Sequence, residues 1–227
     1  AALEDLQDYH GVVLHPKSKE VWVMHPFSAA PTNFFIKADH CCWWGNCAWC
    51  SMGAAALLKC DLTITTTAGA EAKQLIVKVK DGQLEQNSLL VHFPIPMQQA
   101  WDNVTYTCSN MLLFESEQDI LNWCQRHRMP VGDIQPLHKI WQFSQIWYGN
   151  HMRQDWHKWT IDEARALFQQ FGLLPWRSVR ENVGLGLELA GMPVAERKQR
   201  VDQQLALVNL SQWADRKVGE LSGGMQQ

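Results

Sequence analysis

The side chains best suited to chemistry lie close together within residues 43–53. Cys47 and Cys50 stand three positions apart there, and Cys41 and Cys42 lie just upstream, so four of the seven cysteines fall within ten residues. Several tryptophans surround them. Sulfur is a soft ligand that prefers soft metals, and the aromatic rings would keep water away from it. The stretch therefore predicts a reactive or metal-binding thiol centre.

The apolar run at residues 54–58 follows this cluster and predicts the start of a helix. Backbone dipoles at a helix N-terminus favour negative charge, so a thiolate placed there has a lowered pKa. We therefore expect Cys47 and Cys50 on a turn that leads from a loop into a helix.

The cysteine cluster also allows packing, zinc-binding and redox roles. Buried cysteine often serves only for packing, although four neighbouring cysteines argue against that role alone. A closed zinc site generally has a second CxxC-like pair or spaced histidines. His40 could join Cys41, Cys47 and Cys50, but the adjacent residues His40 and Cys41 fit poorly around one ion. A thioredoxin-type redox motif would need a βαβ context, which the sequence does not predict.

The composition is that of a globular protein, with 46% hydrophobic and 19% charged residues in a chain of 227. The net charge of -3, without a basic block, argues against nucleic acid as a partner. No apolar run approaches the roughly 18 residues that a membrane helix requires, so direct membrane insertion is not expected. The odd number of cysteines and their crowding favour a reducing cytoplasm over a secreted disulfide framework.

Alternating and β-branched segments predict antiparallel strands in the first part of the chain. Residues 11–14 and 20–24 predict one hairpin. Residues 75–80 and 83–85 predict a second hairpin around Asp81-Gly82, a dipeptide that is typical of tight turns.

Helices are predicted where capping residues precede apolar periodicity. Ser116 caps one helix, residues 137–148 form another, and Thr160 with Glu163 starts a third as a capping box. Cys108 is expected at a turn into a buried strand. Together with the hairpins, these elements indicate an α+β fold with a mainly antiparallel sheet and helices.

Several motifs within residues 11–172 resemble the organomercurial (alkylmercury) lyase family. They are HPFSAAPT at 25–32, NCAWC at 46–50, VHF at 91–93, TCSNMLLFES at 107–116 and WTIDE at 159–163. The resemblance implies an alkylmercury-lyase-like core that acts on carbon–mercury bonds with two cysteines and one aspartate. Cys50 and Cys108 occupy the positions of the two cysteines. The aspartate would come three residues after Cys50, where this chain has Gly53.

This resemblance implies that the thiolates of Cys50 and Cys108 coordinate the mercury of R–Hg⁺. Their sulfur atoms should then lie within about 4–6 Å of each other, because both must reach one ion. The proton that captures the departing carbon needs another donor, and Cys47 is the nearest candidate. We therefore expect Cys47, Cys50 and Cys108 as catalytic and metal-binding residues, Cys60 and Cys124 elsewhere, and at least one of the tryptophans 43, 44 or 49 in the pocket wall.

Residues 168–227 resemble the ATP-binding subunit of ABC importers of the nitrate, sulfonate and taurine type. The motifs are FQ at 168–169 with LLPW at 173–176, which is similar to a Q-loop, RENV at 180–183, and the signature-like LSGGMQQ at 221–227. The resemblance implies that Gln169, Ser222, Gly223 and Gly224 bind ATP that a complete ABC partner holds. The chain contains no GxxxxGK[ST] phosphate loop, so we expect no ATPase activity from it alone.

The sequence thus predicts an alkylmercury-lyase-like domain over residues 1–172 and a partial, helical ABC ATPase subdomain over residues 173–227, with exposed apolar faces in the latter. A natural fusion, a rearranged gene and a misassembled reading frame all stay open. The functions that stay open are thiol-mediated carbon–mercury cleavage, non-catalytic binding of Hg²⁺, Cu⁺ or Zn²⁺ beside an ABC importer, and an interaction module without chemistry. Expected partners are an organomercurial or soft-metal ligand, small thiols and ABC transporter subunits, and no resident cofactor is required.

Overall fold

The computed structural model divides into two compact units, Ala1–Lys158 and Trp159–Gln227, which are described separately below. The structure describes the whole chain except for residues 1, 9–10, 86–87, 96–102, 171–177, 185–186, 188–191 and 217–227. The boundary expected between residues 172 and 173 lies outside the described residues. No helix of the described part is long and apolar enough to cross a bilayer.

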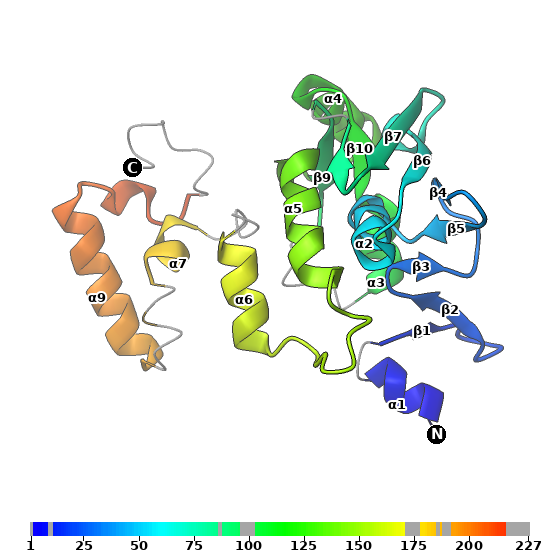
Figure 1. Ribbon diagram of the computed structural model, residues 1–227. Helices are drawn as coiled ribbons and strands as arrows, with labels where there is room; N and C mark the ends of the chain where they lie inside the picture. The colour runs from blue at the N-terminus through cyan, green and yellow to red at the C-terminus, as the bar shows by residue number, and fades with distance from the viewer. Residues whose placement is uncertain are drawn as a thin grey trace. The chain divides into compact units, whose positions relative to one another are not determined.

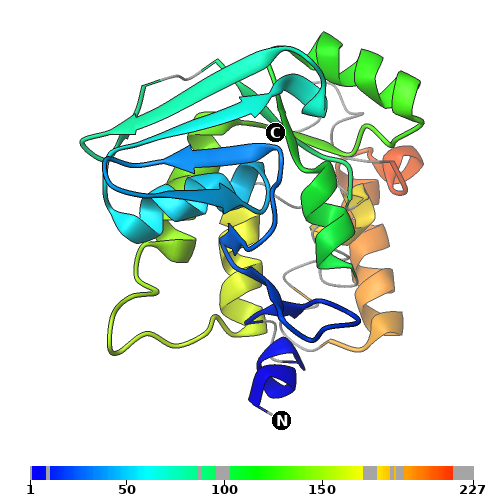
Figure 2. The ribbon, with the colours of Figure 1, turned by 90° about the vertical axis from the view of Figure 1, so that its right-hand side faces the viewer.

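The first unit contains two antiparallel sheets, one of eight strands and one of three. Figure 2 shows the strands of the larger sheet side by side, in the order β1-β2-β3-β5-β4-β6-β7-β8. The smaller sheet has the order β10-β9-β11. The prediction of an α+β fold with a mainly antiparallel sheet is confirmed. The strands are β1 (Val13–Leu14), β2 (Val21–Met24), β3 (Phe27–Ser28), β4 (Phe34–Lys37), β5 (Cys42–Gly45), β6 (Leu62–Thr67), β7 (Gln74–Lys80), β8 (Gln83–Leu84), β9 (Leu90–Phe93), β10 (Leu112–Phe114) and β11 (Asp133–Pro136).

The hairpin of β7 and β8 follows directly from local sequence. Asp81 and Gly82 both have positive φ angles, 50° and 71°, as the predicted tight turn requires. Along β7, buried and exposed residues alternate, with Leu75, Val77 and Val79 turned to the core. This alternation fixes the register, because a shift by one residue would expose the apolar set.

The helices of the first unit are centred on α2 (Ala48–Leu58), whose residues 48–56 are all buried. A helix that is apolar on every side must be covered on every side. Figure 1 shows α2 between α5 (Leu137–Tyr148) and strands of the larger sheet, and α2 contacts both. Three further helices are described in this unit: α1 (Ala2–Asp8), α3 (Val104–Asn110) and α4 (Glu117–His127).

Two local predictions in this unit are wrong. Helix α2 begins at Ala48, six residues before the predicted start, because Cys47 caps it through its sulfur. Cys108 lies in helix α3 and not in a strand; Asn103 caps this helix by accepting from the Tyr106 N–H, and β10 begins only at Leu112. The β-branched residues before Cys108 favour a strand, but the local cap outweighs that preference.

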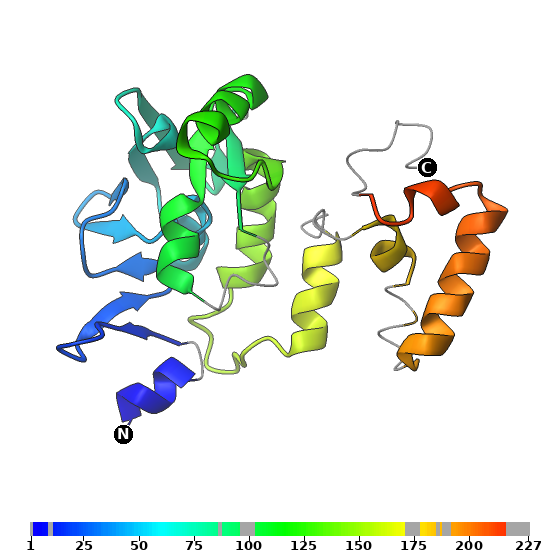
Figure 3. The ribbon, with the colours of Figure 1, turned by 180° about the vertical axis from the view of Figure 1, so that it is seen from behind.

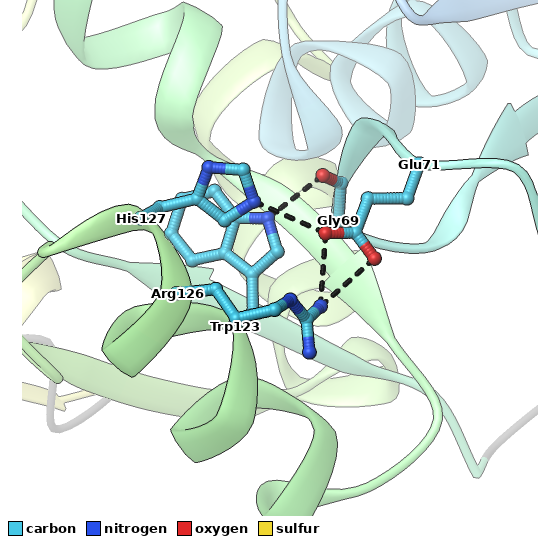
Figure 4. A network of polar contacts seen from close by, with 5 residues as sticks. All are labelled: Gly69, Glu71, Trp123, Arg126 and His127. Carbon is cyan, nitrogen blue, oxygen red and sulfur yellow. Dashed lines mark hydrogen bonds and ion pairs between the residues drawn. The ribbon is translucent and has the colours of Figure 1, made fainter.

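Helix α4 is held at its end by a polar network with the short 3₁₀ turn η1 (Ala68–Ala70), drawn in Figure 4. The Arg126 guanidinium donates to both carboxylate oxygens of Glu71 at 2.9 Å, and His127 Nε2 lies 3.0 Å from one of them. The indole N–H of Trp123 donates to the Gly69 carbonyl at 2.9 Å. Ser116 caps the other end of α4, as predicted.

The second unit is helical in its described part, as predicted, and is seen from behind in Figure 3. It contains α6 (Ile161–Gln170), α7 (Val179–Val183), α9 (Val194–Leu207) and the 3₁₀ turn η3 (Ser211–Trp213). The predicted capping box of Thr160 and Glu163 starts α6. Val194 and Leu207 stay 70% and 75% exposed, in agreement with the expected exposed apolar residues.

Candidate thiol site

Three buried cysteines converge in the interior of the first unit. The Sγ atoms of Cys47, Cys50 and Cys108 all lie within 4.8 Å of one another, close enough to share one metal ion. The predicted approach of Cys50 and Cys108 is therefore seen. The structure also brings in Cys47, so three thiols and not two are available to a soft metal.

The start of α2 creates this arrangement. Cys47 has extended backbone angles and its Sγ accepts the Cys50 backbone N–H at 3.2 Å, so the thiol replaces the usual capping hydroxyl. The next amide, of Ala48, donates to the Met111 carbonyl at 3.1 Å. Since Met111 follows α3, this bond holds the end of α3, and with it Cys108, against the N-terminus of α2.

Met111 adds a fourth sulfur that the sequence did not point to. Its thioether Sδ lies 3.5 Å from the Sγ of Cys47, and its side chain is buried. A buried methionine between two elements usually indicates only packing, so no sequence signal marks it.

The three thiols differ in acidity because they hydrogen-bond to one another. Burial raises the pKa of Cys47, but hydrogen bonds from the thiols of Cys108 and Cys50 and from the Cys50 N–H outweigh it and bring that pKa well below its usual value. Hydrogen bonding to Cys47 and Cys50, together with burial, raises the pKa of Cys108.

For Cys50, a hydrogen bond with Cys108 lowers the pKa, but bonding to Cys47, burial and the charge of Cys47 raise it by more. Cys47 is therefore the most acidic thiol of the group, at a helix N-terminus that favours its charged form.

His25 reaches the site from the end of β2. Its Nδ1 lies 3.6 Å from the Sγ of Cys50. Burial lowers the pKa of His25, and the nearby Cys47 opposes this shift only in part, so the imidazole is neutral at pH 7. In the sequence His25 is the first residue of the HPFSAAPT motif, and it was not expected to be part of the site.

Tyr148 reaches the same cysteine from the last residue of α5. Its hydroxyl oxygen lies 3.9 Å from the Sγ of Cys50, and its side chain is 3% exposed. Its ring lies against Gly53, one turn beyond Cys50, where any Cβ would clash with the ring atoms Cδ2 and Cε2. The sequence predicted this helix well, but nothing in its periodicity separates Tyr148 from the other core residues.

The remaining cysteines lie apart from the site. Cys41, Cys42 and Cys60 are exposed. Cys124 is buried beside His92, with its Sγ 3.6 Å from Nε2. The set of His40, Cys41, Cys47 and Cys50 is not formed, and neither is a joint cluster of the four neighbouring cysteines: Cys41 precedes β5 and Cys42 lies on it, whereas Cys47 and Cys50 turn inward with α2. As predicted, Cys60 and Cys124 stand elsewhere.

The three tryptophans of the motif have different surroundings. Trp49 is buried and packs on Phe143, Trp147 and Tyr148 of α5, with ring centroids 5.1, 5.5 and 5.9 Å apart. Trp43 and Trp44 lie on β5 and contact Phe27 and Phe35. Trp49 thus joins the two helices that carry Cys50 and Tyr148, and a role of these tryptophans as pocket walls stays a prediction.

The first unit matches the sequence model of a known protein family. The model of the alkylmercury lyase family, MerB, matches residues 27–149, more than half of the chain. The chain belongs to the alkylmercury lyase family. A solved structure described as the mercury-bound form of MerB2 has the same fold, with a TM-score of 0.52 and 18% identity over 67% of this chain and 72% of that one.

The C-terminal part of this alkylmercury lyase family member matches a second model, that of ABC transporters, over residues 131–227. The taurine import ATP-binding protein TauB of Pseudomonas entomophila (strain L48) is 48% identical over 65 residues, which cover 29% of this chain and 25% of that protein. The spermidine/putrescine import ATP-binding protein PotA of Roseobacter denitrificans is 51% identical over 64 residues, 28% of this chain and 18% of that protein. The chain therefore spans a quarter or less of the length of these relatives.

The residues expected to contact ATP lie mostly outside the described part. Ser222, Gly223 and Gly224 fall in the stretch 217–227, which the structure does not describe. The backbone of Gln169 belongs to α6. Their predicted role in nucleotide binding stays a prediction.

Proposed function

We propose that the first unit is an organomercurial-lyase-like protein that binds R–Hg⁺ and cleaves its carbon–mercury bond. The observation that carries this proposal is the convergence of Cys47, Cys50 and Cys108, whose buried sulfur atoms lie within 4.8 Å of one another. Mercury is a soft metal that thiolates bind in preference to oxygen or nitrogen ligands. Membership of the alkylmercury lyase family supports the same chemistry.

Cys47 is the first ligand in this proposal, because hydrogen bonds lower its pKa and make it the most acidic thiol of the group. Its sulfur displaces X⁻ from R–Hg–X and forms Cys47–S–Hg–R. The sulfur of Cys50 or Cys108 then bonds to mercury as the carbon–mercury bond breaks. The electron pair of that bond stays on carbon, which takes up the proton released by the second thiol and leaves as R–H. Mercury stays divalent throughout.

Two small thiols complete the cycle. Each returns a proton to one of the two bound cysteines, and the mercury leaves as Hg(SR′)₂. This order uses Cys47 and one of the other two cysteines expected from the sequence. Cys47 acts in it as a metal ligand and not as the proton donor, the two roles that the sequence left to it.

A second candidate function is soft-metal binding without turnover, beside an ABC importer. Gly53 stands where the family resemblance places an acid, and within the described residues the thiol group includes no carboxylate. A site that lacks a proton source would hold mercury and not release hydrocarbon.

The deciding experiment supplies a phenylmercury salt with an excess of small thiol and measures benzene release and mercury bound per chain. A variant with Cys47→Ser, Cys50→Ser and Cys108→Ser removes the site, and its matched control carries Cys41→Ser, Cys42→Ser and Cys60→Ser at the exposed positions. We expect repeated benzene release from the native chain and the control only. Retained mercury without benzene release would favour the binding function. If the native chain neither retains mercury nor releases benzene, both functions are overturned.

We also infer an association with an ABC transporter, supported by the match of residues 131–227. Ser222, Gly223, Gly224 and Gln169 would contact ATP only in a complex with a complete ABC subunit, since this chain has no phosphate loop. The purified chain should release no phosphate from ATP, and measurable hydrolysis would contradict this assignment.

A further inference from the structure

We propose that the hydroxyl of Tyr148 delivers the proton to the departing carbon when the thiol site cleaves a carbon–mercury bond. The inference rests on the proposed lyase function and names the residue that passes the proton of the second thiol to carbon. Carbon–mercury cleavage produces a carbon centre that must be protonated at once, so a donor has to stand beside the sulfur that attacks mercury.

The position of Tyr148 fits this role. Its hydroxyl lies 3.9 Å from the Sγ of Cys50, within the reach of a hydrogen bond to sulfur. Its ring is fixed between Trp49, at a centroid distance of 5.9 Å, and Gly53. Because α2 and α5 pack directly on each other, the hydroxyl is held in place without a loop that would have to close.

The Tyr148 ring occupies the space that a side chain at position 53 would need. Gly53 follows Cys50 by one helical turn, so its side chain would project beside the thiols. The Tyr148 ring already occupies that volume, since a Cβ on Gly53 would clash with two of its ring carbons. An acid at position 53 and the present tyrosine therefore exclude each other, and the glycine is what admits the phenol to the site.

Among the titratable groups that contact Cys50 in the described part of the chain, Tyr148 supplies a hydroxyl. These groups are Cys47, Cys108, His25 and Tyr148. Cys47 and Cys50 are the mercury ligands in this step, and Cys108 hydrogen-bonds to both of them. A phenol beside the attacking thiol can pass its proton to carbon and take one back from that thiol.

The step balances with groups that the site contains. Cys47 holds the substrate as Cys47–S–Hg–R, and the sulfur of Cys50 attacks mercury. The carbon–mercury bond breaks with its electron pair on carbon, the Tyr148 hydroxyl proton moves to that carbon, and the S–H proton of Cys50 moves to the Tyr148 oxygen. The products are R–H and Cys47–S–Hg–S–Cys50, and Tyr148 is restored.

The test compares Tyr148→Phe with the native chain in a single turnover of bound phenylmercury. The control is Tyr106→Phe, which removes the hydroxyl of an exposed tyrosine. We expect Tyr148→Phe to slow benzene release by about 100-fold, the usual contribution of a positioned acid, while the amount of phenylmercury retained stays unchanged. Tyr106→Phe should match the native chain. A structural role alone would lower retention and release together.

A second variant, Gly53→Ala, displaces the Tyr148 ring without removing its hydroxyl. Its methyl group must push the Tyr148 ring away, so we expect the same slow release with thiols still able to retain phenylmercury. Equal release from Tyr148→Phe and the native chain would overturn the proton-delivery role and leave the lyase function intact. Absence of benzene from the native chain would overturn the lyase function, and the role of Tyr148 with it.

Discussion

The two units of this chain differ in the extent of their described apolar cores. In the first unit the core extends through both sheets and α2, with Phe34, Ile64 and Leu137 at most 2% exposed. In the described part of the second unit, a single cluster contains four buried residues, and Leu187, Leu210 and Trp213 pack against it. The buried residues of this cluster are Val179, Val201, Leu205 and Ala214.

This difference accounts for where chemistry can be placed. Desolvation shifts the pKa of an ionisable group only where packing excludes water, and the thiols lie in such an interior. A small core contributes little to the free energy of folding and cannot also carry the cost of buried polar groups. All seven cysteines lie in the first unit, so the thiol site belongs to that unit.

The largest expected effect comes from single thiol substitutions in the first unit. Cys47→Ser and Cys50→Ser should each lower benzene release by at least about 100-fold, because each removes one of the two sulfurs that form Cys47–S–Hg–S–Cys50. Cys124→Ser, which removes an equally buried thiol outside the site, should leave release unchanged. Release measured under excess thiol checks this, and equal losses for all three variants would show that burial and not the grouping matters.

The next prediction tests whether the units are independent. Ile64→Ala in β6 and Leu205→Ala in α9 both remove buried methyl groups, and each should lower the free energy of unfolding of its own unit by about 2–5 kcal/mol. Ile64→Ala should therefore reduce phenylmercury retention under mild denaturant, whereas Leu205→Ala should not. Urea unfolding followed by circular dichroism, with retention measured in parallel, checks this. Loss of phenylmercury retention in Leu205→Ala would show that the two units do not unfold independently.

A smaller effect is expected from Asp133, at the start of β11. Burial raises the pKa of its carboxyl to about 6, although Gln135 donates to both of its oxygens. A raised folded-state pKa favours the protonated form, so this contribution to stability is full below about pH 4 and is lost as the pH rises through 6. Asp133→Asn should thus stabilise the chain by about 1–3 kcal/mol at pH 7 and not at pH 4. Thermal unfolding at both pH values measures this.

The smallest effect is expected at the exposed network of Glu71, Arg126 and His127. Glu71→Gln should cost less than about 1 kcal/mol, since exposed ion pairs gain little over solvated charges. Hydrogen bonds from Arg126 and His127 lower the pKa of Glu71, so this stability is present above the unfolded pKa and is lost as the pH falls. Salt should reduce the difference between variant and native chain. A larger cost that salt does not change would show that the network is part of the core.

The sequence by itself determined the elements that depend on near neighbours. The Asp81-Gly82 turn forms because both residues tolerate positive φ, and α5 forms over residues 137–148 because its apolar residues recur with helical spacing. Ser116 caps α4 because its side chain accepts a hydrogen bond from the N–H of Asp119, three residues further along the chain. The cysteine cluster and the convergence of Cys50 with Cys108 were also predictable, the latter from the family resemblance.

Only the tertiary structure decided the composition and the acidity of the site. The pKa of Cys47 is lowered because its sulfur accepts hydrogen bonds from the thiols of Cys50 and Cys108 at a helix N-terminus, which no local pattern predicts. Tyr148 lies 98 residues beyond Cys50 in the chain and meets it only because α5 packs on α2 at Gly53. Periodicity predicts which face of a helix is buried, but the partner that a buried side chain meets depends on packing between elements far apart in sequence.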